Sequence, residues 1–485
     1  MTEEKNAALA RETAADEQKL QKERKTIDAL TDFSNMYDFK KASNHEYKTE
    51  AGLTPDVVRE ISAKKDEPKW MLDARLKSLD LYYQIPYPVW GPDISGLDMA
   101  NIVTYVRPNA RMSANWNDLP EDIKDTFDRL GIPEAEKTSL AGVGAQYDSE
   151  VVYHSIQDEL VKQGVIYTDF DTAVKKYEDI VRKHFMKLIP PTDHKFAALH
   201  GAVWSGGSFV YVPEGVDVSI PLQSYFRLNA PGAGQFEHTM IIVEKGAKVH
   251  FIEGCSAPKY NVANLHAGAV ELFIGDDATL TYSTIENWSK NMYNMNTIVG
   301  KNGTINWVTG SFGSHTSCLY PMSILNGEGA HCEFTGVTFA GKGQYLDTGS
   351  KVVHNAPHTT SNINSKSISK DGGVCIYRGS VVINECAEGS KSNVSCESLM
   401  LDEQSQSDTI PAIVIKNDNV DLGHEAKIGR ISDEAIFYLM SRGLSEDEAR
   451  AMLVRGFVDP VSKALPLEYA VEMNNLINLE LKGSM

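Results

Sequence analysis

Residues 243–253 read VEKGAKVHFIE, and this stretch holds the pattern that decides the fold. The apolar Val243 is followed four positions later by the small Ala247, and two positions after that by the apolar Val249. From Val249 onward, apolar and polar side chains alternate with a period of two, which indicates a β-strand and not a helix. Gly246, between the two apolar positions, predicts a turn at a corner.

The same pattern recurs along the chain between about residues 212 and 374. A period of this size is typical of a solenoid, in which one coil cannot bury its own apolar face and successive coils must stack. We therefore predict a β-helix of about seven or more coils. An antiparallel β-sandwich with accidental spacing remains the alternative. The copies lie 31, 31, 25, 26, 21 and 22 residues apart, by subtraction of their first positions: Val212, Val243, Ile274, Val299, Leu325, Leu346 and Ile368.

Composition and charge exclude several classes of protein. The 485 residues include 47 Lys and Arg against 66 Asp and Glu, a formal net charge of −19. Nucleic-acid binding is disfavoured, because a phosphate backbone requires a basic face. No apolar stretch reaches the length of a membrane span, and the first thirty residues are charged and lack the apolar centre of a signal peptide. We therefore expect a cytoplasmic protein that binds neither nucleic acid nor a membrane.

Helical patterns lie on both sides of the repeats. Thr54-Pro55 predicts a helix N-cap followed by Pro at the first helical position. Ser445-Glu446-Asp447-Glu448 is a capping box near the other end. Two further helices are expected over residues 153–165 and 173–188. The expected domains are a flexible segment over residues 1–41, an α-rich region over 42–195, a β-helix core over 196–426 and a C-terminal helical domain over 427–485.

Known catalytic motifs are missing from the sequence. It holds neither GxxxxGKS nor GxxxxGKT, so the chain is not a P-loop ATPase, and it has no HExxH and no GxSxG. Asp276-Asp277 lie at a predicted corner with no adjacent Lys or Arg, which argues against a β-helix enzyme that cleaves acidic polysaccharides. The six cysteines form no CxxC pair, so a closed zinc site is not expected. We expect Cys332 and Cys375 to be buried, as small apolar side chains within coils.

Two places could carry chemistry. Cys255 ends a predicted strand before a turn, so its thiol could be reachable, but a reactive thiolate needs a lowered pKa and the sequence reveals no positive neighbour. Cys396 lies 28 residues before His424-Glu425, about one coil, so the three groups could lie on adjacent rungs. Thiolate, imidazole and carboxylate together suit iron, and three ligands leave positions open for a cluster that is handed on. In both places a purely structural role is the alternative.

These stretches also carry a resemblance to a known family. The chain resembles the SufB branch of the SufB/SufD family, the scaffold subunits of the SUF iron–sulfur cluster assembly system, over nearly everything after about residue 50. The matching segments are 67–71 (EPKWM), 75–79 (RLKSL), 131–136 (GIPEAE), 196–199 (FAAL), 202–209 (AVWSGGSF), 367–370 (SISK), 407–411 (SDTIP), 424–426 (HEA) and 437–443 (FYLMSRG).

The resemblance implies an architecture and a set of partners. It implies a mainly β fold, with a right-handed parallel β-helix flanked by helical ends, in a scaffold protein that is not itself an enzyme. The ATPase SufC would dock on the C-terminal helices, and SufD or a second SufB-type copy would complete a dimer. A cysteine desulfurase with a sulfur-carrier protein would supply sulfur. A transient 4Fe-4S or 2Fe-2S cluster would then pass to apo iron–sulfur acceptor proteins.

The resemblance also assigns residues. Cys255 matches the family's sulfur acceptor, while Cys396 and Glu425 match its cluster-assembly residues, with His424 beside them. The presence of Cys396 and of the His-Glu pair favours the SufB branch. An architectural, SufD-like subunit is the alternative, and it predicts no cluster even with partners present. A β-helix polysaccharide lyase or hydrolase is the enzyme alternative, and it predicts secretion and a groove of carboxylates, neither of which is visible.

An internal sulfur path is implied less directly. Thr284, Glu286 and Trp288 match the part of the family that is thought to pass sulfur along the inside of the solenoid. The family usually has Gln where Glu286 stands. A lysine expected shortly afterwards is replaced around residues 297–299, with Lys301 as a substitute.

Overall fold

The computed structural model describes residues 39–42, 44–288, 292–301, 303–463, 465 and 467–482. For residues 292–301, and for parts of the last helix, only the backbone is described. Most of the segment expected to be flexible, residues 1–41, lies outside the described residues. So do the side chains of residues 297–299 and of Lys301, on which the expected departure from the family pattern falls.

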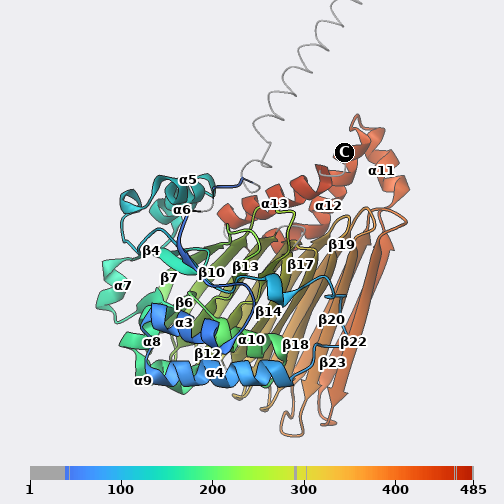
Figure 1. Ribbon diagram of the computed structural model, residues 1–485. Helices are drawn as coiled ribbons and strands as arrows, with labels where there is room; N and C mark the ends of the chain where they lie inside the picture. The colour runs from blue at the N-terminus through green and yellow to red at the C-terminus, as the bar shows by residue number, and fades with distance from the viewer. Residues whose placement is uncertain are drawn as a thin grey trace, which may run out of the picture. The chain divides into compact units, whose positions relative to one another are not determined.

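Two sheets form the body of residues 40–485 (Figure 1). From β6 to β23, long strands alternate between the two sheets, so each coil contributes a strand to each of them, and the pairs between these coils are parallel. Only β3–β4 and β5–β6, at the N-terminal end, pair antiparallel within these sheets. The predicted mainly β fold with a parallel β-helix core is confirmed, and the sandwich alternative is wrong.

The ten-stranded sheet contains, from its N-terminal end, β4 (Glu150–Ile156), β3 (Gly142–Tyr147), β7 (Asp217–Arg227), β10 (Lys248–Ser256), β13 (Thr279–Trp288), β15 (Thr304–Gly313), β17 (His331–Ala340), β19 (Thr360–Ser369), β21 (Lys391–Met400) and β23 (Asp421–Arg430).

The eleven-stranded sheet contains β5 (Ile166–Asp169), β6 (Ser208–Val212), β9 (His238–Val243), β12 (Ala269–Ile274), β14 (Met292–Lys301), β16 (Thr316–Leu325), β18 (Tyr345–His354), β20 (Val374–Ile383) and β22 (Gln406–Ile415), with the short β8 (Gly234–Gln235) and β11 (Asn264–His266) beside this path. A separate two-stranded sheet pairs β1 (His45–Lys48) with β2 (Val106–Pro108).

The sequence repeat marks one corner of the coil in its first five copies. Val243 ends β9 and Val249 belongs to β10, so the pattern spans the turn from one sheet to the other. The last two copies are different. The one that begins at Leu346 lies inside β18, and the one that begins at Ile368 lies at the opposite corner, between β19 and β20.

The short spacings of 21 and 22 residues are therefore wrong as coil lengths. They arise because a small residue in the middle of an alternating strand imitates the corner pattern. The register pairs one residue of each coil with the next, and these stacked residues lie 31, 25, 27, 29, 31 and 30 positions apart by subtraction: Val249, Leu280, Ile305, Cys332, Ser361, Ser392 and Leu422.

The corners need a residue in the left-handed region of backbone space. Gly246, Gly303 and Gly329 have φ of 68°, 64° and 74°, and Asp277 takes the same place with φ of 57°. Asp277 is thus a corner residue, as predicted. At Gly303 a Cβ atom would lie 2.4 Å from Ile274 Cγ2 and 2.7 Å from the carbonyl oxygen of Gly275, so no larger residue fits there without a shift of the neighbouring coil.

The interior of the β-helix is a continuous apolar core. The rings of Phe251, Tyr282 and Trp307 form a row on the inner face of the ten-stranded sheet, with centroid separations of 6.0 and 5.6 Å, and Tyr167 from the opposite sheet lies 6.0 Å from Phe251. Cys332 and Cys375 are buried, as predicted.

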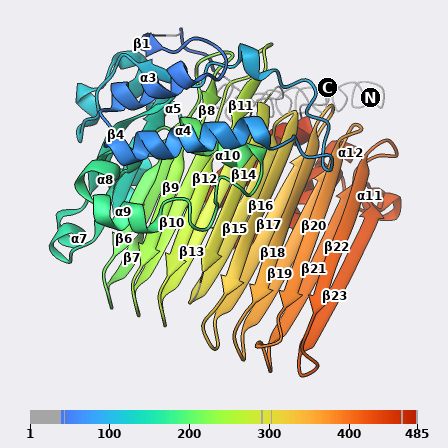
Figure 2. The same ribbon diagram turned by 60° about the horizontal axis from the view of Figure 1, so that its bottom comes forward.

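N-terminal helices cover part of the eleven-stranded sheet (Figure 2). The core that they share with it includes Val57, Ile61, Leu79, Leu199 and Leu265. Thr54 caps the first helix as predicted, because its Oγ1 accepts from the Val57 amide at 3.2 Å. The helical segments are α3 (Pro55–Lys65), α4 (Lys69–Gln84), η1 (Met99–Asn101), η2 (Trp116–Asp118), α5 (Glu121–Arg129), α6 (Ile132–Ser139), α7 (Asp158–Lys162), α8 (Phe170–Lys176), α9 (Glu178–His184) and α10 (Lys195–Val203).

Two helix predictions in this region are wrong in part. The helix expected over residues 153–165 is strand β4 followed by the short α7. The β-branched and aromatic residues around Tyr153 pair with β3 at the end of the ten-stranded sheet, so tertiary pairing outweighs the helical spacing. The helix expected over residues 173–188 is broken at Tyr177 into α8 and α9.

The C-terminal helices lie beside the ten-stranded sheet (Figure 1). They are α11 (Asp433–Met440), α12 (Glu446–Ser462) and α13 (Leu467–Lys482). The predicted capping box is present: Ser445 Oγ accepts from the Glu448 amide at 3.3 Å, and Glu448 Oε2 accepts from the Ser445 amide at 2.8 Å. Lys370 Nζ donates to the carbonyl oxygen of Leu481 at 2.6 Å and ties α13 to the coils. Of the helices described, none has the length and apolar character needed to cross a membrane.

Candidate functional site

Cys255 lies inside the β-helix. It belongs to β10, in register with Phe226 of β7 and Glu286 of β13, and only 1% of its surface is exposed. Its apolar neighbours include Phe226, Leu228 and Trp288. The expectation that a turn leaves this thiol reachable is therefore wrong, because the strands of the coils on both sides cover it.

The surroundings of Cys255 favour the neutral thiol. Burial is the largest effect, and the carboxylates of Glu253, Glu237 and Glu286 add to it, so the pKa of Cys255 lies well above its usual value. Burial and the charge of Glu237 also raise the pKa of Glu253 to about 8. Cys255 can react as a thiolate only after these surroundings change.

His266 and Glu237 complete a compact group with Cys255. Each of the three residues offers one metal-ligating atom, and these atoms all lie within 4.8 Å of one another. His266 Nε2 is hydrogen-bonded to Glu237 Oε1, and the His266 ring lies 4.3 Å from the ring of Trp288. Sequence reasoning missed both residues. Their only local signal is an ionisable side chain within an apolar stretch, and their contact depends on how the coils stack.

Thr284, Glu286 and Trp288 lie on β13, and all three are buried. Alternate residues of a strand point to the same side, so the three side chains share one face. Register places Glu286 beside Cys255 and Thr284 beside Glu253. The structure thus brings Glu286 and Trp288 to Cys255, with Thr284 on the adjacent rung position.

A row of small residues connects this region with Cys396. In the ten-stranded sheet the register runs from Thr284 through Thr309, Gly336 and Ser365 to Cys396, with one residue in each coil. Thr309, Gly336 and Ser365 line a small enclosed cavity, together with hydroxyls from the neighbouring positions and from the opposite sheet.

Cys396 and His424 face each other near the C-terminal end of the β-helix. Cys396 lies on β21 and His424 on the adjacent β23, and Cys396 Sγ is 4.0 Å from His424 Nε2. Register pairs Cys396 with Ala426 and Val394 with His424, so both side chains point to the same side of the sheet. Burial raises the pKa of Cys396 to about 12. The expectation that Cys396 and His424 lie on adjacent rungs is confirmed.

Glu425 is not part of this pair. It stands opposite Ser395, one position away from the Cys396 register, so its side chain points to the other face of the sheet. There it forms an ion pair with Lys427 at 3.1 Å, and 61% of its side chain is exposed. In this conformation Glu425 does not share a set of metal donors with Cys396 and His424.

The coil that holds His424 is the last one. Strands β22 and β23 end the two sheets, and their outer edges pair with no described strand (Figure 2). Over most of the length of β22 and β23, residues on both faces of the strand are exposed, because no further described coil covers these strands. We call this last coil, with its unpaired edges, the open end. Its large exposed apolar side chains are Ile410, Ile413, Val414, Ile415 and Ile428.

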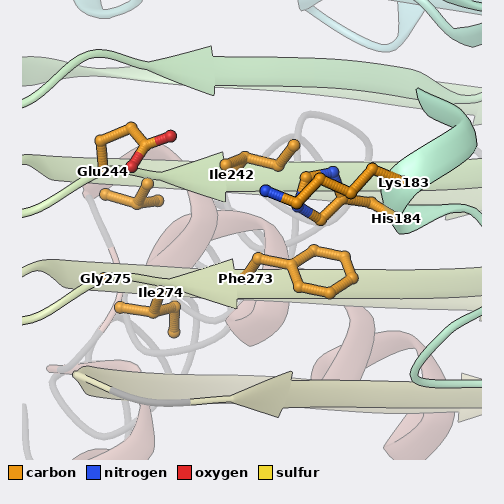
Figure 3. Close-up of a pocket in the computed structure, with 8 residues that line it drawn as sticks. Lys183, His184, Ile242, Glu244, Phe273, Ile274 and Gly275 are labelled. Atoms are coloured by element: carbon orange, nitrogen blue, oxygen red, sulfur yellow. The ribbon is translucent and has the colours of Figure 1, made fainter. Parts of the chain in front are cut away.

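A separate pocket lies on the outer surface, between α9 and the eleven-stranded sheet (Figure 3). Lys183 and His184 come from α9, and Glu244 and Phe273 come from the sheet side. None of the predicted site residues lines this pocket.

Comparisons with known proteins found family models and relatives that match most of the chain. The family model described as the SUF system FeS cluster assembly, SufBD core domain, matches residues 226–457, and the model of the SufBD protein N-terminal region matches residues 97–224. The iron–sulfur cluster assembly protein SufB of Bacillus subtilis (strain 168) is 52% identical over 442 residues, which cover 90% of this chain and 95% of the relative. An iron–sulfur cluster assembly SufBD family protein of Staphylococcus aureus (strain MRSA252) is 51% identical over the same lengths.

Proposed function

The chain belongs to the SufBD family of iron–sulfur cluster assembly proteins, and from this premise we propose that it is the scaffold on which a transient cluster is built, at its open end. The observation that carries the proposal is the pair of Cys396 Sγ and His424 Nε2, which are 4.0 Å apart, with His424 in the last coil and Cys396 in the coil before it. A thiolate and an imidazole bind iron well but cannot complete the ligand set of a 4Fe-4S or 2Fe-2S cluster. The missing ligands come from a partner at this end.

The open end provides the surface for that partner. Unpaired strand edges and exposed Ile and Val side chains suit a second β-helix that continues the stack. The partner is SufD or a second SufB-type copy. Glu425 joins the donor set when docking rearranges the last coil, since in the free chain it faces away from Cys396.

Sulfur enters the scaffold at Cys255. The thiolate of Cys255 attacks the outer sulfur of a persulfide on the donor protein, the S–S bond to the donor breaks, and the donor cysteine leaves as a thiolate. No oxidant is consumed. Because Cys255 is buried and its pKa is raised, this step requires the donor, a cysteine desulfurase with its sulfur-carrier protein, to open the coils around it.

Sulfur then moves along the inside of the β-helix. The route begins beside Glu286 and Trp288, continues from Thr284 and follows the row of small residues through Thr309 and Ser365 to Cys396. The energy for opening the scaffold comes from ATP hydrolysis by SufC, which docks on the C-terminal helices. Phe437 and Tyr438 of α11 are 74% and 56% exposed and offer apolar contacts for it. Each sulfane sulfur that reaches Cys396 takes up two electrons from an external electron donor to become cluster sulfide, and the finished cluster passes to apo iron–sulfur acceptor proteins.

Anaerobic reconstitution tests the cluster site. The chain and its partners are mixed with Fe²⁺ and sulfide, and the cluster is measured by absorption and by bound iron. Cys396→Ser and His424→Ala should each lose most of the cluster, because each removes a ligand that the partner cannot replace. Cys375→Ser, which changes a buried cysteine on β20 in the opposite sheet, is the matched control and should hold as much cluster as the parent.

Two outcomes would contradict the assignment. A Cys396→Ser variant that holds as much cluster as the parent would place the cluster elsewhere. A parent complex that holds no cluster at all would favour the architectural, SufD-like role.

A further inference from the structure

A second group of metal-ligating side chains lies in the β-helix, several coils from the open end. Glu237 directly precedes β9, Cys255 lies on β10 and His266 ends β11. All three are buried, and their ligating atoms lie within 4.8 Å of one another. We propose that Glu237, Cys255 and His266 bind a divalent iron or zinc ion, in a site distinct from Cys396 and His424.

The geometry is close to that of a tetrahedral site. With metal–sulfur bonds of about 2.3 Å and metal–nitrogen bonds of about 2.0 Å, neighbouring ligand atoms are roughly 3.5 Å apart. Small rotations of the three side chains would bring their ligating atoms from the observed separations, all within 4.8 Å, to about this distance. The ion takes the place of the proton that His266 Nε2 and Glu237 Oε1 share.

An unsatisfied oxygen points independently to a bound cation. Glu237 Oε2 is buried and has no hydrogen-bond partner within the part of the chain that the structure describes. A buried carboxylate oxygen without a partner destabilises the folded chain more than the loss of an ordinary hydrogen bond does, unless a positive charge faces it. Register places Glu286 beside Cys255, and Glu253 lies two positions before Cys255 on the same strand, so three carboxyl groups converge where His266 is the ligating base.

The donor set selects the class of metal. One thiolate, one imidazole and one carboxylate suit Fe²⁺ or Zn²⁺, whereas Mg²⁺ and Ca²⁺ require oxygen ligands. Three protein ligands leave a fourth position open, as in sites where a bound metal meets a small exogenous ligand. The site goes beyond the proposed scaffold function, because metal binding here requires neither partners nor sulfur transfer.

Metal titration of the full-length chain tests the site. The chain is treated with a chelator under anaerobic conditions and titrated with Zn²⁺ or Fe²⁺ alone, and with Co²⁺ as a spectroscopic probe of thiolate ligation. The double variant Cys396→Ser, His424→Ala removes the cluster pair, so that the buried group is observed by itself. We expect this double variant to bind one metal ion at the buried group, and its cobalt form to show a thiolate-to-cobalt absorption band.

Variants in that background identify the ligands. Cys255→Ser should abolish the cobalt band, and His266→Gln and Glu237→Gln should each weaken the affinity by about tenfold or more. Cys375→Ser is the matched control and should change neither. Circular dichroism shows whether each variant is folded. If Cys255→Ser does not fold, the two Gln variants test the proposed metal site by themselves. An unchanged affinity in both Gln variants would overturn the proposal, and so would a background variant that binds no metal. Neither outcome would bear on reconstitution at Cys396.

Discussion

At the scale of residues, the inner face of the ten-stranded sheet carries two kinds of side chain. One row holds the aromatic rings of Phe251, Tyr282 and Trp307, one in each coil. The row two positions further along each strand holds Thr284, Thr309, Gly336 and Ser365 and ends at Cys396. The ring row seals the interior, while the second row leaves small spaces bordered by hydroxyls. In our proposal sulfur follows the second row between coils, where Ser311 and Thr338 of the neighbouring row border the same cavity.

Filling that row should stop sulfur transfer without affecting sulfur uptake. In Ser365→Leu a larger side chain occupies the cavity one rung below Cys396, at a cost of about 1 to 3 kcal/mol in the free energy of unfolding. We expect labelled sulfur on Cys255 to stay at the level of the parent, whereas cluster built from that sulfur falls to about a tenth. Cluster built from free sulfide should not change. The measurements are protein-bound label and cluster absorption.

The control for this variant is Ser365→Ala, which keeps the row open and should transfer sulfur like the parent. Cys255→Ser should take up no label at all. Equal transfer in Ser365→Leu and in the parent would show that sulfur takes another route.

The site could be predicted from sequence only where one coil separates two residues. Cys396 and His424 are such a pair, and the 28-residue gap places them together. The gap does not say which way a side chain points, so Glu425, one position further on, faces the opposite side. Cys255 was expected at a reachable turn, because the cover from the neighbouring coils is not visible in its own segment. His266 and Glu237 come from separate turns, and only stacking reveals their contact.

At the scale of elements, β22 and β23 differ from the other strands of their sheets. Among the described strands, each pairs on one side only, and the consecutive Val414 and Ile415 are both exposed, although they point to opposite faces. Interior strands such as β15 and β17 have a neighbour on both sides and bury their inward side chains. These two strands therefore behave as the edge of an interface.

A charge at the open end should separate the chain from its partner. Val414 is 45% exposed, so Val414→Glu should change the stability of the isolated chain by no more than about 0.5 kcal/mol. In the complex the carboxylate would be partly covered, as Val382 is one coil earlier, and would lose hydration and an apolar contact, so we expect the dissociation constant to rise about tenfold. Sedimentation of the mixed subunits measures this change. Val262→Glu, at an equally apolar position that is 48% exposed and lies before β11, is the matched control, and equal effects of the two variants would contradict the assignment.

Elements with local signals were predictable. Thr54 and Ser445 cap their helices as the sequence indicates, because a cap depends only on residues within one turn. Strand β4 and the break between α8 and α9 were not predictable in this way. β4 forms a hairpin with the adjacent β3, which the pairing of β3 with the distant β7 holds in the ten-stranded sheet, and α8 packs against the distant β6 and β9.

At the scale of the whole molecule, buried histidines make the fold sensitive to acid. His354 is fully buried, where its Nδ1 and Nε2 lie 2.8 and 3.0 Å from the hydroxyls of Thr359 and Ser361. Burial lowers its pKa to about 4. An unfolded histidine has a pKa of about 6.5, so below that pH the unfolded chain binds a proton that the folded chain excludes, and stability is lost as the pH falls toward 4.

Replacing this histidine should remove part of the acid sensitivity. Between pH 7.5 and pH 5 the parent should lose about 2 kcal/mol more of its free energy of unfolding than His354→Gln, because glutamine stays neutral at both values. Denaturant titrations of both proteins at the two pH values give the change in the free energy of unfolding for each. Any effect of the substitution on stability that does not depend on pH cancels when the two changes are compared. An equal loss in both proteins would show that His354 is protonated in the folded chain.

The absence of a further coil beyond β22 and β23 has a thermodynamic consequence. In a stacked array, stability is nearly a sum over nearest-neighbour contacts, so a terminal unit with one neighbour unravels at a lower free energy than any unit with two. His424 belongs to that terminal unit, while Cys396 remains anchored one layer deeper. Brief fraying of a single layer would thus uncover both groups while the rest of the array stays intact, and a second protomer stacked against it would suppress the fraying.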